Sequence, residues 1–356
     1  MQHRSGALLF KAGPAAFADI RKRGFATERI GTIAGASGGA KWLVLSQLDR
    51  VMVNDVMPAI AGPVHLIGSS IGAWRFACYA QRDSLTAIER FEEAYLAQTY
   101  SEKPDVAEIT AKTREILDHV IGTDGAEQIV QNAHCRLHIM TVRCGRMTSS
   151  DWRPLLTAGL LMAATSNVFS RRSLGLFFSR ALFYDARDLP PFYNASGFPL
   201  HRIPLTSENL PDAVMASGAI PLVLAGVRDI AGAPAGTYRD GGVIDYHLDL
   251  PLSDPDRLTL FPHFFEQLVP GWFDKLLRYR RHGLDSTDRT VLICPSPEFI
   301  ASLPHGKVPD RHDFINFPPA EREKNWRRVV AECARLRDEL RDVLEHDKLA
   351  ARLESL

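Results

Sequence analysis

The amino-acid sequence predicts an α/β protein with three layers, in which a mostly parallel central sheet lies between two layers of helices. Two apolar runs, at Ile30–Ala34 and Val64–Ile67, each lead into a short turn rich in glycine and serine and then into a helix-like segment. This repeated order of strand, tight turn and helix is typical of a parallel sheet covered by helices. With 356 residues, of which 46% are hydrophobic, the chain can fill a sizeable core.

The other elements follow from hydrophobic spacing and from residues that end helices. The segment Ala15–Arg23 has a helical pattern, and Gly24 after it favours a helix end. Alternating polar and apolar residues over Arg136–Arg143 predict a strand with one exposed face. Turn-forming residues predict loops from Leu189 to Pro211. Further helices are predicted over Lys41–Val53, Ala73–Gln81, Ser84–Leu96 and Asp212–Ala219, and a further strand over Thr290–Cys294.

Two longer segments stand out by their composition. Leu155–Phe183 is rich in Leu, Phe and Ala and carries Arg171, Arg172 and Arg180. These residues allow a pair of helices packed in the core or an apolar surface that touches lipid, and packing is the favoured interpretation. The segment Pro318–Leu356 is charged, with apolar residues at three- and four-residue spacing, which predicts helices with a solvated outer face.

The charge balance and the cysteine pattern exclude several classes of function. Forty-two basic and forty-two acidic residues give zero formal net charge, so no general attraction to nucleic acid is expected. The five cysteines are widely spread without a C-x-x-C pair, which indicates buried thiols in a reducing compartment rather than a zinc or redox site. Lys11 and Asp19 interrupt any apolar stretch near the N-terminus, so no secretory signal is expected.

The apolar run Leu155–Phe169 is shorter than the ~20 residues that cross a bilayer and contains polar side chains. We therefore expect a cytoplasmic protein that does not span a membrane but can touch a membrane surface.

Both glycine-serine turns match the pattern G-x-S-x-G. The first is Gly35-Ala36-Ser37-Gly38-Gly39, continued by Ala40-Lys41, and the second is Gly68-Ser69-Ser70-Ile71-Gly72-Ala73. This pattern can hold a serine on a strained turn between a strand and a helix, with its hydroxyl above the carboxyl end of a parallel sheet. A nucleophilic serine is therefore the leading hypothesis for the function.

The second turn is the better candidate for the nucleophile. An apolar strand runs straight into Gly68, so Ser70 is assigned as the attacking residue. In the first turn, consecutive backbone N–H groups at a helix start would favour negative charge on a substrate oxygen. The oxyanion hole is accordingly assigned to Gly38, Gly39, Ala40 and Lys41.

Ser37 is the alternative nucleophile. Its own oxyanion loop would have to be the upstream stretch Lys11–Pro14, which contains one glycine and a proline without an N–H donor. A phosphate-binding loop is a weaker interpretation of the same turn, because Lys41 is followed by Trp42 rather than by the Ser or Thr that would hold magnesium.

Four motifs, in this order, resemble those of the patatin-like phospholipases, a family of lipid acyl hydrolases that use a serine–aspartate dyad. In that family a glycine-rich oxyanion segment ending in a basic residue comes first and the G-x-S-x-G serine follows one strand later, as 38–41 and Ser70 do here. Ala216–Pro221 is similar to the family's A-S-x-A-x-P stretch, and Asp240-Gly241-Gly242 resembles its D-G-G/A turn. The resemblance extends from Gly35 to Pro251 and implies a patatin-like fold and hydrolysis of carboxylic esters.

The resemblance implies that Ser70 and Asp240 form the catalytic dyad and that no catalytic histidine is needed. A carboxylate can accept the serine proton directly when burial raises its pKa towards the working pH. His247 lies close to Asp240 in the sequence, but we expect a surface or hydrogen-bonded histidine there rather than a third catalytic member.

Two departures from the family pattern bear on substrate preference. Ser37 stands where a third glycine is common, and Trp42 stands where a glycine usually follows the basic residue, so Trp42 is expected to narrow the loop or line the substrate site. The stretch from Asp245 to Pro251 is also longer than the usual approach to the proline.

The resemblance further implies a catalytic domain at residues 1–295, with a motif-bearing core at about 30–255, and a helical C-terminal extension at 296–356. The expected partner is a lipid or another acyl ester, and the chemistry implies no cofactor. No metal site is predicted, since His134 and His138 lie four apart on a predicted strand, which would not aim both at one ion. An acyltransferase that uses the same dyad and a silent scaffold that binds lipid or protein are the alternatives.

Overall fold

The structure is a computed structural model that describes residues 6–252, 254–277, 279–280 and 283–356. Its centre is one sheet with the strand order β11-β1-β10-β9-β2-β3-β4-β5-β6, in which β8 also pairs with β4, and β7 pairs with β8. The strands are β1 (Leu8–Ala12), β2 (Ile30–Gly35), β3 (Val64–Ser69), β4 (Cys135–Cys144), β5 (Phe178–Tyr184), β6 (Leu200–Pro204), β7 (Val227–Arg228), β8 (Thr237–Asp240), β9 (Leu258–Pro262), β10 (Thr290–Pro295) and β11 (Leu353–Ser355).

Most neighbouring strands in this sheet run parallel. The central run from β10 through β9, β2 and β3 to β4 is parallel throughout, and so are the pairs β5–β6 and β1–β11. Antiparallel pairs join β1 to β10, β4 to β5, β4 to β8 and β7 to β8. Strand β2 is buried along its whole length, as expected for a parallel strand covered on both faces.

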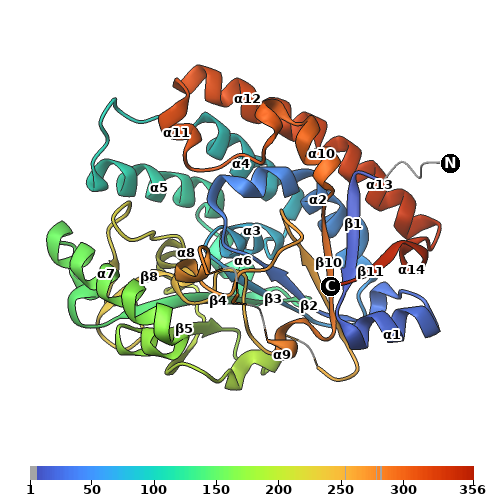
Figure 1. Cartoon of the computed structure of the whole chain (residues 1–356), viewed down its shortest axis with the longest axis horizontal. Helices are drawn as coiled ribbons and strands as arrows, with labels where there is room; N and C mark the ends of the chain where they lie inside the picture. Colours follow the sequence, from blue (N-terminus) through green and yellow to red (C-terminus); the bar gives the residue numbers. More distant parts are fainter. Residues whose placement is uncertain (1–5, 253, 278, 281–282) are drawn as a thin grey trace.

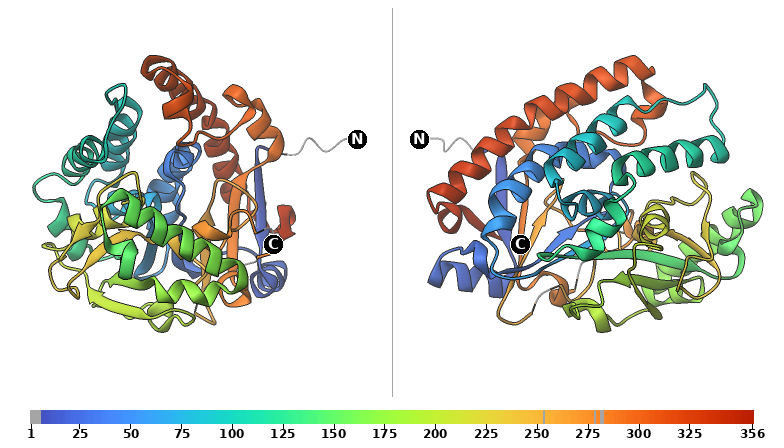
Figure 2. Two further views of the ribbon diagram at one scale, coloured as in Figure 1. Left: turned by 60° about the vertical axis from the view of Figure 1, so that its left-hand side comes forward. Right: turned by 180° about the vertical axis from the view of Figure 1, so that it is seen from behind.

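Helices cover both faces of the sheet, with α4, α12 and α13 on one side and α1 and α7 on the other (Figure 1). Figure 2 shows the same layers from two further directions. The predicted three-layer α/β architecture with a mostly parallel sheet is confirmed. The helices are α1 (Pro14–Arg23), α2 (Ser46–Val51), α3 (Ile71–Tyr79), α4 (Ser84–Ala97), α5 (Val106–Ile121), α6 (Gly125–Gln131), α7 (Arg153–Phe169), α8 (Leu210–Ser217), α9 (Leu284–Thr287), α10 (Pro297–Ser302), α11 (Asp313–Asn316), α12 (Pro319–Glu332), α13 (Ala334–Glu345) and α14 (Leu349–Arg352).

The described part of the chain contains no helix that is long and apolar enough to cross a bilayer. All five cysteines are buried and unbridged, which confirms the prediction of buried thiols.

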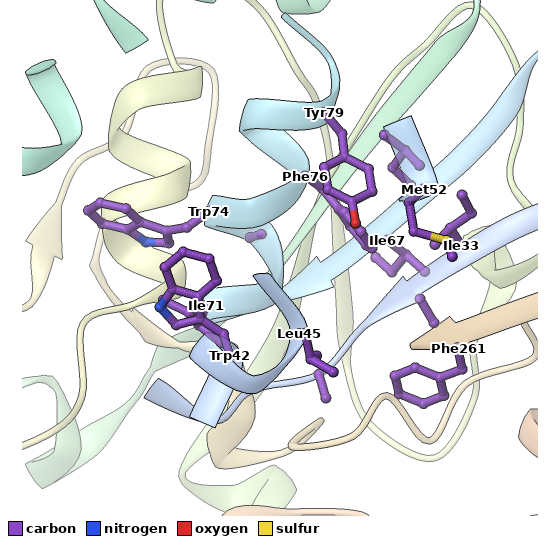
Figure 3. Packing of buried hydrophobic residues seen from close by; sticks show 14 of the residues in the cluster. Ile33, Trp42, Leu45, Met52, Ile67, Ile71, Trp74, Phe76, Tyr79 and Phe261 are labelled. Carbon is purple, nitrogen blue, oxygen red and sulfur yellow. The ribbon is translucent and has the colours of Figure 1, made fainter. Parts of the chain in front are cut away.

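The main core lies between the sheet and the helices that follow the two glycine-serine turns. Ile33 and Ile67 of the central strands meet the side chains of α3 in this layer (Figure 3). The ring of Trp42 stacks on Phe91 with 4.6 Å between ring centroids and is fully buried. Of the two roles predicted for Trp42, lining the substrate site is wrong, because this residue packs into the core, and narrowing of the loop stays a prediction.

Other predicted elements differ in kind from those observed. The segment Leu155–Phe183 does not form a pair of α-helices: α7 is followed by a 3₁₀ helix (Arg171–Leu176) and then by strand β5, because the last part of the segment pairs along β4. The helix expected over Lys41–Val53 is divided into a 3₁₀ helix (Gly39–Leu45), α2 and a π-helical turn (Met52–Val56).

Two predictions about strands also need correction. Strand β4 is buried on both faces rather than on one, because α8 packs on it and Val142 and Cys144 join a second apolar cluster beside α7. The loop-rich region from Leu189 to Pro211 contains strand β6, which extends the sheet beyond β5.

The C-terminal segment is helical and returns to the sheet. Helix α13 contacts α2 and β1, α12 contacts α4, and the final strand β11 pairs with β1. The division of the chain at residue 295 stays a prediction.

Candidate active site

Ser70 lies on a strained turn between β3 and α3. Its backbone has φ 55° and ψ −128°, a conformation that non-glycine residues rarely adopt and that costs roughly 1–3 kcal/mol. The turn is possible because Gly72 lies directly against the end of β2: a Cβ atom at position 72 would lie 2.0 Å from the carbonyl oxygen of Gly35. The predicted strand–serine–helix geometry is thus present at Ser70, which is buried with 5% exposure.

Asp240 reaches Ser70 because β3 and β8 share one edge of β4. Strand β5 occupies the other edge, along 139–144. On the shared edge, the last residue of β3, Ser69, pairs with Met140 of β4. The last residue of β8, Asp240, pairs with the next residue of β4, Thr141. The carboxyl ends of β3 and β8 therefore meet at the serine turn.

The side chains of Ser70 and Asp240 are hydrogen bonded. Ser70 Oγ donates to Asp240 Oδ2 over 2.6 Å, and the backbone N–H of Gly242 donates to Asp240 Oδ1 over 2.7 Å. Burial raises the pKa of the Asp240 carboxyl to about 6, although both hydrogen bonds and the positive charge of Lys275 favour the carboxylate. A carboxylate with this pKa is suited to accept and return a proton near neutral pH.

Gly241 and Gly242 let the backbone after Asp240 pass close to both serine turns. A Cβ atom at position 241 would lie 2.2 Å from the carbonyl oxygen of Met140, and one at 242 would lie 2.5 Å from Ser37 Oγ. Any larger residue at either position would push the aspartate turn away from the serine.

Ser217, in the Ala216–Pro221 motif, holds the serine turn in place. Its Oγ accepts a hydrogen bond from the backbone N–H of Ser70 over 2.8 Å and donates one to the carbonyl oxygen of Met140 over 2.8 Å. In the same motif, the carbonyl oxygen of Ala219 accepts from the backbone N–H of Asp240 over 3.1 Å. This motif therefore contacts both members of the pair.

The segment assigned to the oxyanion hole lies beside the same turns. Its 3₁₀ helix begins at Gly39, and the hydrogen bond from Lys41 N–H to the Gly38 carbonyl closes its first turn, so the N–H groups of Gly38, Gly39 and Ala40 precede it. Gly39 has φ +56°, and a Cβ atom at Gly38 would lie 2.6 Å from the ring of Phe264. Gly39 is thus favoured by its backbone conformation and Gly38 by the close approach of the Phe264 ring.

Ser37 has a different environment from Ser70. Its hydroxyl donates to Ser69 Oγ over 3.0 Å, and its backbone N–H donates to the carbonyl oxygen of Tyr246. The carboxylate of Asp240 therefore contacts Ser70, whereas the hydroxyl of Ser37 bonds another hydroxyl that links the two turns.

A cavity of about 560 Å³ opens beside the oxyanion segment. Lys41 lines it, and Lys41 Nζ donates to the phenol oxygen of Tyr246 over 3.3 Å. Lys275, at the exposed rim, places its Nζ 3.8 Å from the centroid of the Tyr246 ring. Desolvation lowers the pKa of both lysines, and the positive charge of Lys41 lowers the pKa of Lys275 further, to about 7. The other lining residues are His247, Phe264, Phe265, Glu266, Gln267, Val269, Pro295, Pro297, Ile300, Ala301 and Gly306.

Buried ion pairs support the chain that follows Asp240. Arg180 on β5 makes a two-fold hydrogen bond to Asp245, with N–O distances of 2.8 and 2.7 Å, and both side chains are fully buried. Arg171 donates to the carbonyl oxygen of Ile244 over 2.8 Å and pairs with Asp274. The longer stretch after the D-G-G turn is thus attached to β5 and to the end of α7.

The hydrogen bonds of the Ser70 hydroxyl and the Asp240 carboxylate join them to each other and to the N–H of Gly242, and none of these bonds involves a histidine. His247 is buried, and its Nδ1 accepts a hydrogen bond from the backbone N–H of Val269, in agreement with a hydrogen-bonded role. His138 Nε2 lies 3.0 Å from His65 Nδ1, while His134 Nε2 contacts the carbonyl oxygen of Met57. Within the described ranges, no group of three or more His, Cys, Asp and Glu residues could hold a metal ion.

Sequence reasoning did not find three residues of the site. Ser217 was part of a recognised motif, but its contacts with Ser70 and Met140 depend on the packing of α8 against β4. Tyr246 and Lys275 belong to no motif, and a buried aromatic ring between two lysines appears only after β9 and the 262–275 loop have folded over the oxyanion segment.

The fold and the site together define an α/β protein with a buried serine–carboxylate pair where the carboxyl ends of β3 and β8 meet. No protein-family model and no curated protein sequence matches the chain. Among solved structures, VipD from Legionella pneumophila matches with a TM-score of 0.34 and 13% sequence identity, over 74% of this chain and 54% of that chain. The chain thus spans about half the length of that protein, and a similarity this low carries no information about the reaction.

Proposed function

We propose that the protein is a serine hydrolase that cleaves carboxylic esters of lipids, with Ser70 as nucleophile and Asp240 as general base. The observation that carries this proposal is the 2.6 Å hydrogen bond between Ser70 Oγ and Asp240 Oδ2 at a strained strand-to-helix turn. The ordered motifs that resemble those of the patatin-like phospholipases support the same assignment.

The proposed reaction has two halves. Ser70 Oγ attacks the ester carbonyl carbon while its proton passes to Asp240 Oδ2, and the tetrahedral intermediate then expels the alcohol, which takes that proton from Asp240. In the second half a water molecule attacks the acyl-serine ester and gives its proton to Asp240. Collapse of this intermediate releases the carboxylic acid and returns the proton to Ser70.

The backbone N–H groups of Gly38, Gly39 and Ala40 are proposed to stabilise the negative oxygen of both intermediates. They precede the first closed turn of a helix, so they have no acceptor within it, and the positive end of the helix favours an anion there. Fixed donors of this kind are worth several kcal/mol in the transition state.

A lipid-like substrate is supported by the cavity beside the oxyanion segment. Its walls include Phe264, Phe265, Val269 and Ile300, which suit an apolar chain, and Lys41 and Lys275 suit an anionic or polar group at the same end. Ser70 and Asp240 do not line this cavity, so the cavity would hold a part of the substrate remote from the reacting ester.

Labelling with a fluorophosphonate tests the proposal directly. The folded protein is expected to become covalently labelled at Ser70, and the variant Ser70→Ala is expected to lose the label. Ser37→Ala is the matched control, because Ser37 lies in the first G-x-S-x-G turn and its hydroxyl contacts Ser69 rather than a carboxylate. Labelling that persists in Ser70→Ala and disappears in Ser37→Ala would overturn the assignment, and so would a folded protein that is never labelled and hydrolyses no ester.

A further inference from the structure

Helix α7 presents an apolar surface to solvent. On the outer side of the helix, Leu161, Met162, Val168 and Phe169 are 63%, 53%, 51% and 86% exposed. Their spacing of one, seven and eight positions places them on one side of the helix, opposite the buried residues Leu156, Leu160 and Ala163. We call Leu161, Met162, Thr165, Val168 and Phe169 the α7 face.

The segment between β9 and α9 extends this apolar surface. Tyr279 OH donates to the carbonyl oxygen of Val168 over 3.1 Å, and Tyr279 is 64% exposed. Leu276, in the same loop, is 92% exposed. The surface therefore continues from the end of α7 onto Tyr279, and the exposed Leu276 precedes it by three positions. Large exposed apolar groups gathered in this way mark a site of interaction.

Positive charge borders the α7 face. No charged residue occurs between Arg153 and Arg171, and the exposed Arg172 follows directly after. At the C-terminal end of the helix a cavity of about 460 Å³ is lined by Ser170, Arg171, Arg172, Gly197, Phe198 and Arg280. Arg171 pairs with Asp249 and Asp274, whereas Arg172 is exposed and forms no ion pair with another described residue.

We propose that the α7 face and its bordering arginines form a docking surface for a bilayer that contains anionic phospholipid. A convex apolar helix face with basic residues at its ends matches a membrane surface, in which acyl chains accept the apolar side chains and phosphates accept hydrogen bonds from arginine. A protein partner would be expected to supply a groove for the helix together with carboxylates. The experiments below distinguish such a partner from a bilayer.

The position of α7 would connect docking with the proposed reaction. The buried side of α7 packs in one apolar cluster with Val243 and Ile244, which directly follow the Asp240 turn. A bilayer on the α7 face would therefore lie about one helix diameter, ~10 Å, from the residues next to the proposed base. Docking itself needs no hydrolysis, and only its relevance to substrate delivery rests on the proposed function.

Vesicle sedimentation tests this inference with the full chain carrying Ser70→Ala, so that lipids are not consumed. We expect this protein to sediment with vesicles of phosphatidylcholine and phosphatidylglycerol, and to bind pure phosphatidylcholine at least tenfold more weakly. Adding Leu161→Gln and Phe169→Glu should lower binding to the anionic vesicles at least tenfold. Ile315→Glu is the matched control, because Ile315 on α11 is 82% exposed but lies away from α7, and it should leave binding unchanged.

A second pair of variants tests the role of charge. Arg172→Gln should reduce the preference for anionic vesicles about threefold or more, whereas Arg82→Gln, at an exposed arginine between α3 and α4, should leave it unchanged. With Ser70 intact, the α7-face variants should keep the wild-type rate on a soluble p-nitrophenyl ester and the wild-type circular dichroism spectrum.

Three outcomes would overturn the docking proposal. The parent protein does not bind anionic vesicles; the α7-face variants bind as well as the parent; or wild type is a dimer that Phe169→Glu converts to a monomer without any vesicle binding. In each case fluorophosphonate labelling of Ser70 would still decide the proposed function independently.

Discussion

Ser70 and Asp240 are 170 positions apart in the chain, yet their side chains meet in a 2.6 Å hydrogen bond because β3 and β8 both end at the same point on one edge of β4. The pair is buried, and the backbone of both residues is held by the Ala216–Pro221 motif. This relationship leads to predictions about catalysis, pH dependence and stability.

Replacement of Asp240 by Asn should reduce ester turnover by about 10²–10⁴-fold, the usual contribution of a positioned general base. The amide keeps the size of the side chain, so the fold should be retained, as circular dichroism would check. The turnover number on a p-nitrophenyl ester is the decisive measurement, and wild-type turnover in a folded Asp240→Asn protein would contradict the assigned role.

The rate should depend on the protonation state of Asp240. Because burial raises the pKa of this carboxyl to about 6 and only the carboxylate can accept a proton, kcat/KM should increase as the pH rises through about 6 and then level off. A pH–rate profile on an uncharged ester measures this. A profile that is flat from acid to neutral pH would show that another group limits the reaction.

The same carboxyl should make the protein less stable at high pH. Its pKa is about 6 in the folded protein and near the ordinary 3.8 in the unfolded chain, so the folded state holds the proton more tightly. The stabilising effect of the protonated form is complete below the unfolded value and is lost as the pH rises through the folded value.

Urea unfolding at about pH 4 and about pH 8 tests this linkage. Asp240→Asn cannot ionise, so its stability relative to wild type should increase by up to ~3 kcal/mol between the two pH values. An unchanged difference between the two proteins would mean that the buried carboxylate is stabilised more strongly than its surroundings indicate.

Ser217→Ala should lower the turnover number without much effect on KM. The variant leaves the backbone N–H of Ser70 and the carbonyl oxygen of Met140 without their shared hydroxyl, which should destabilise the fold by about 1–3 kcal/mol and loosen the serine turn. Ser46→Ala is the control, since Ser46 is equally buried but its hydroxyl has no hydrogen-bond partner among the described residues. Equal effects of the two variants would argue against a positioning role for Ser217.

Removal of one member of the Arg180–Asp245 pair should be among the most damaging changes outside the dyad. Arg180→Met leaves a buried carboxylate uncompensated, which should destabilise the protein by about 3–5 kcal/mol in urea unfolding. The control Arg327→Met breaks the exposed pair with Glu93 and should change stability by less than about 1 kcal/mol. A small effect of Arg180→Met would mean that water or a neighbouring group reaches Asp245.

The sequence was most informative where one local rule governs the structure. The apolar runs before Gly35 and Gly68 predicted β2 and β3 because fully buried parallel strands read as continuous apolar stretches. The glycine spacing around Ser70 predicted its strained turn because few other residues could pack against Gly35 there.

Local rules failed where long-range pairing decided the outcome. Phe178–Tyr184 has apolar residues that suit a buried helix, but β4 offers a free edge and makes it a strand. Nothing in the local sequence indicates that Ser217 contacts Ser70 or that Lys275 lies over the Tyr246 ring, because both contacts join segments far apart in the chain.

Because Ser70 and Asp240 are positioned by the same edge of β4, an insertion in β4 can separate them although neither residue is changed. One extra codon between Met140 and Thr141 would shift the partner of β8 along that edge by about 3.3 Å while β3 stayed in register. Such an insertion would leave all four sequence motifs and most of the sheet unchanged, yet it would separate the Ser70 hydroxyl from the Asp240 carboxylate. Homologous chains with all four motifs can therefore be inactive, and the length of β4 is the feature to inspect first when they are compared.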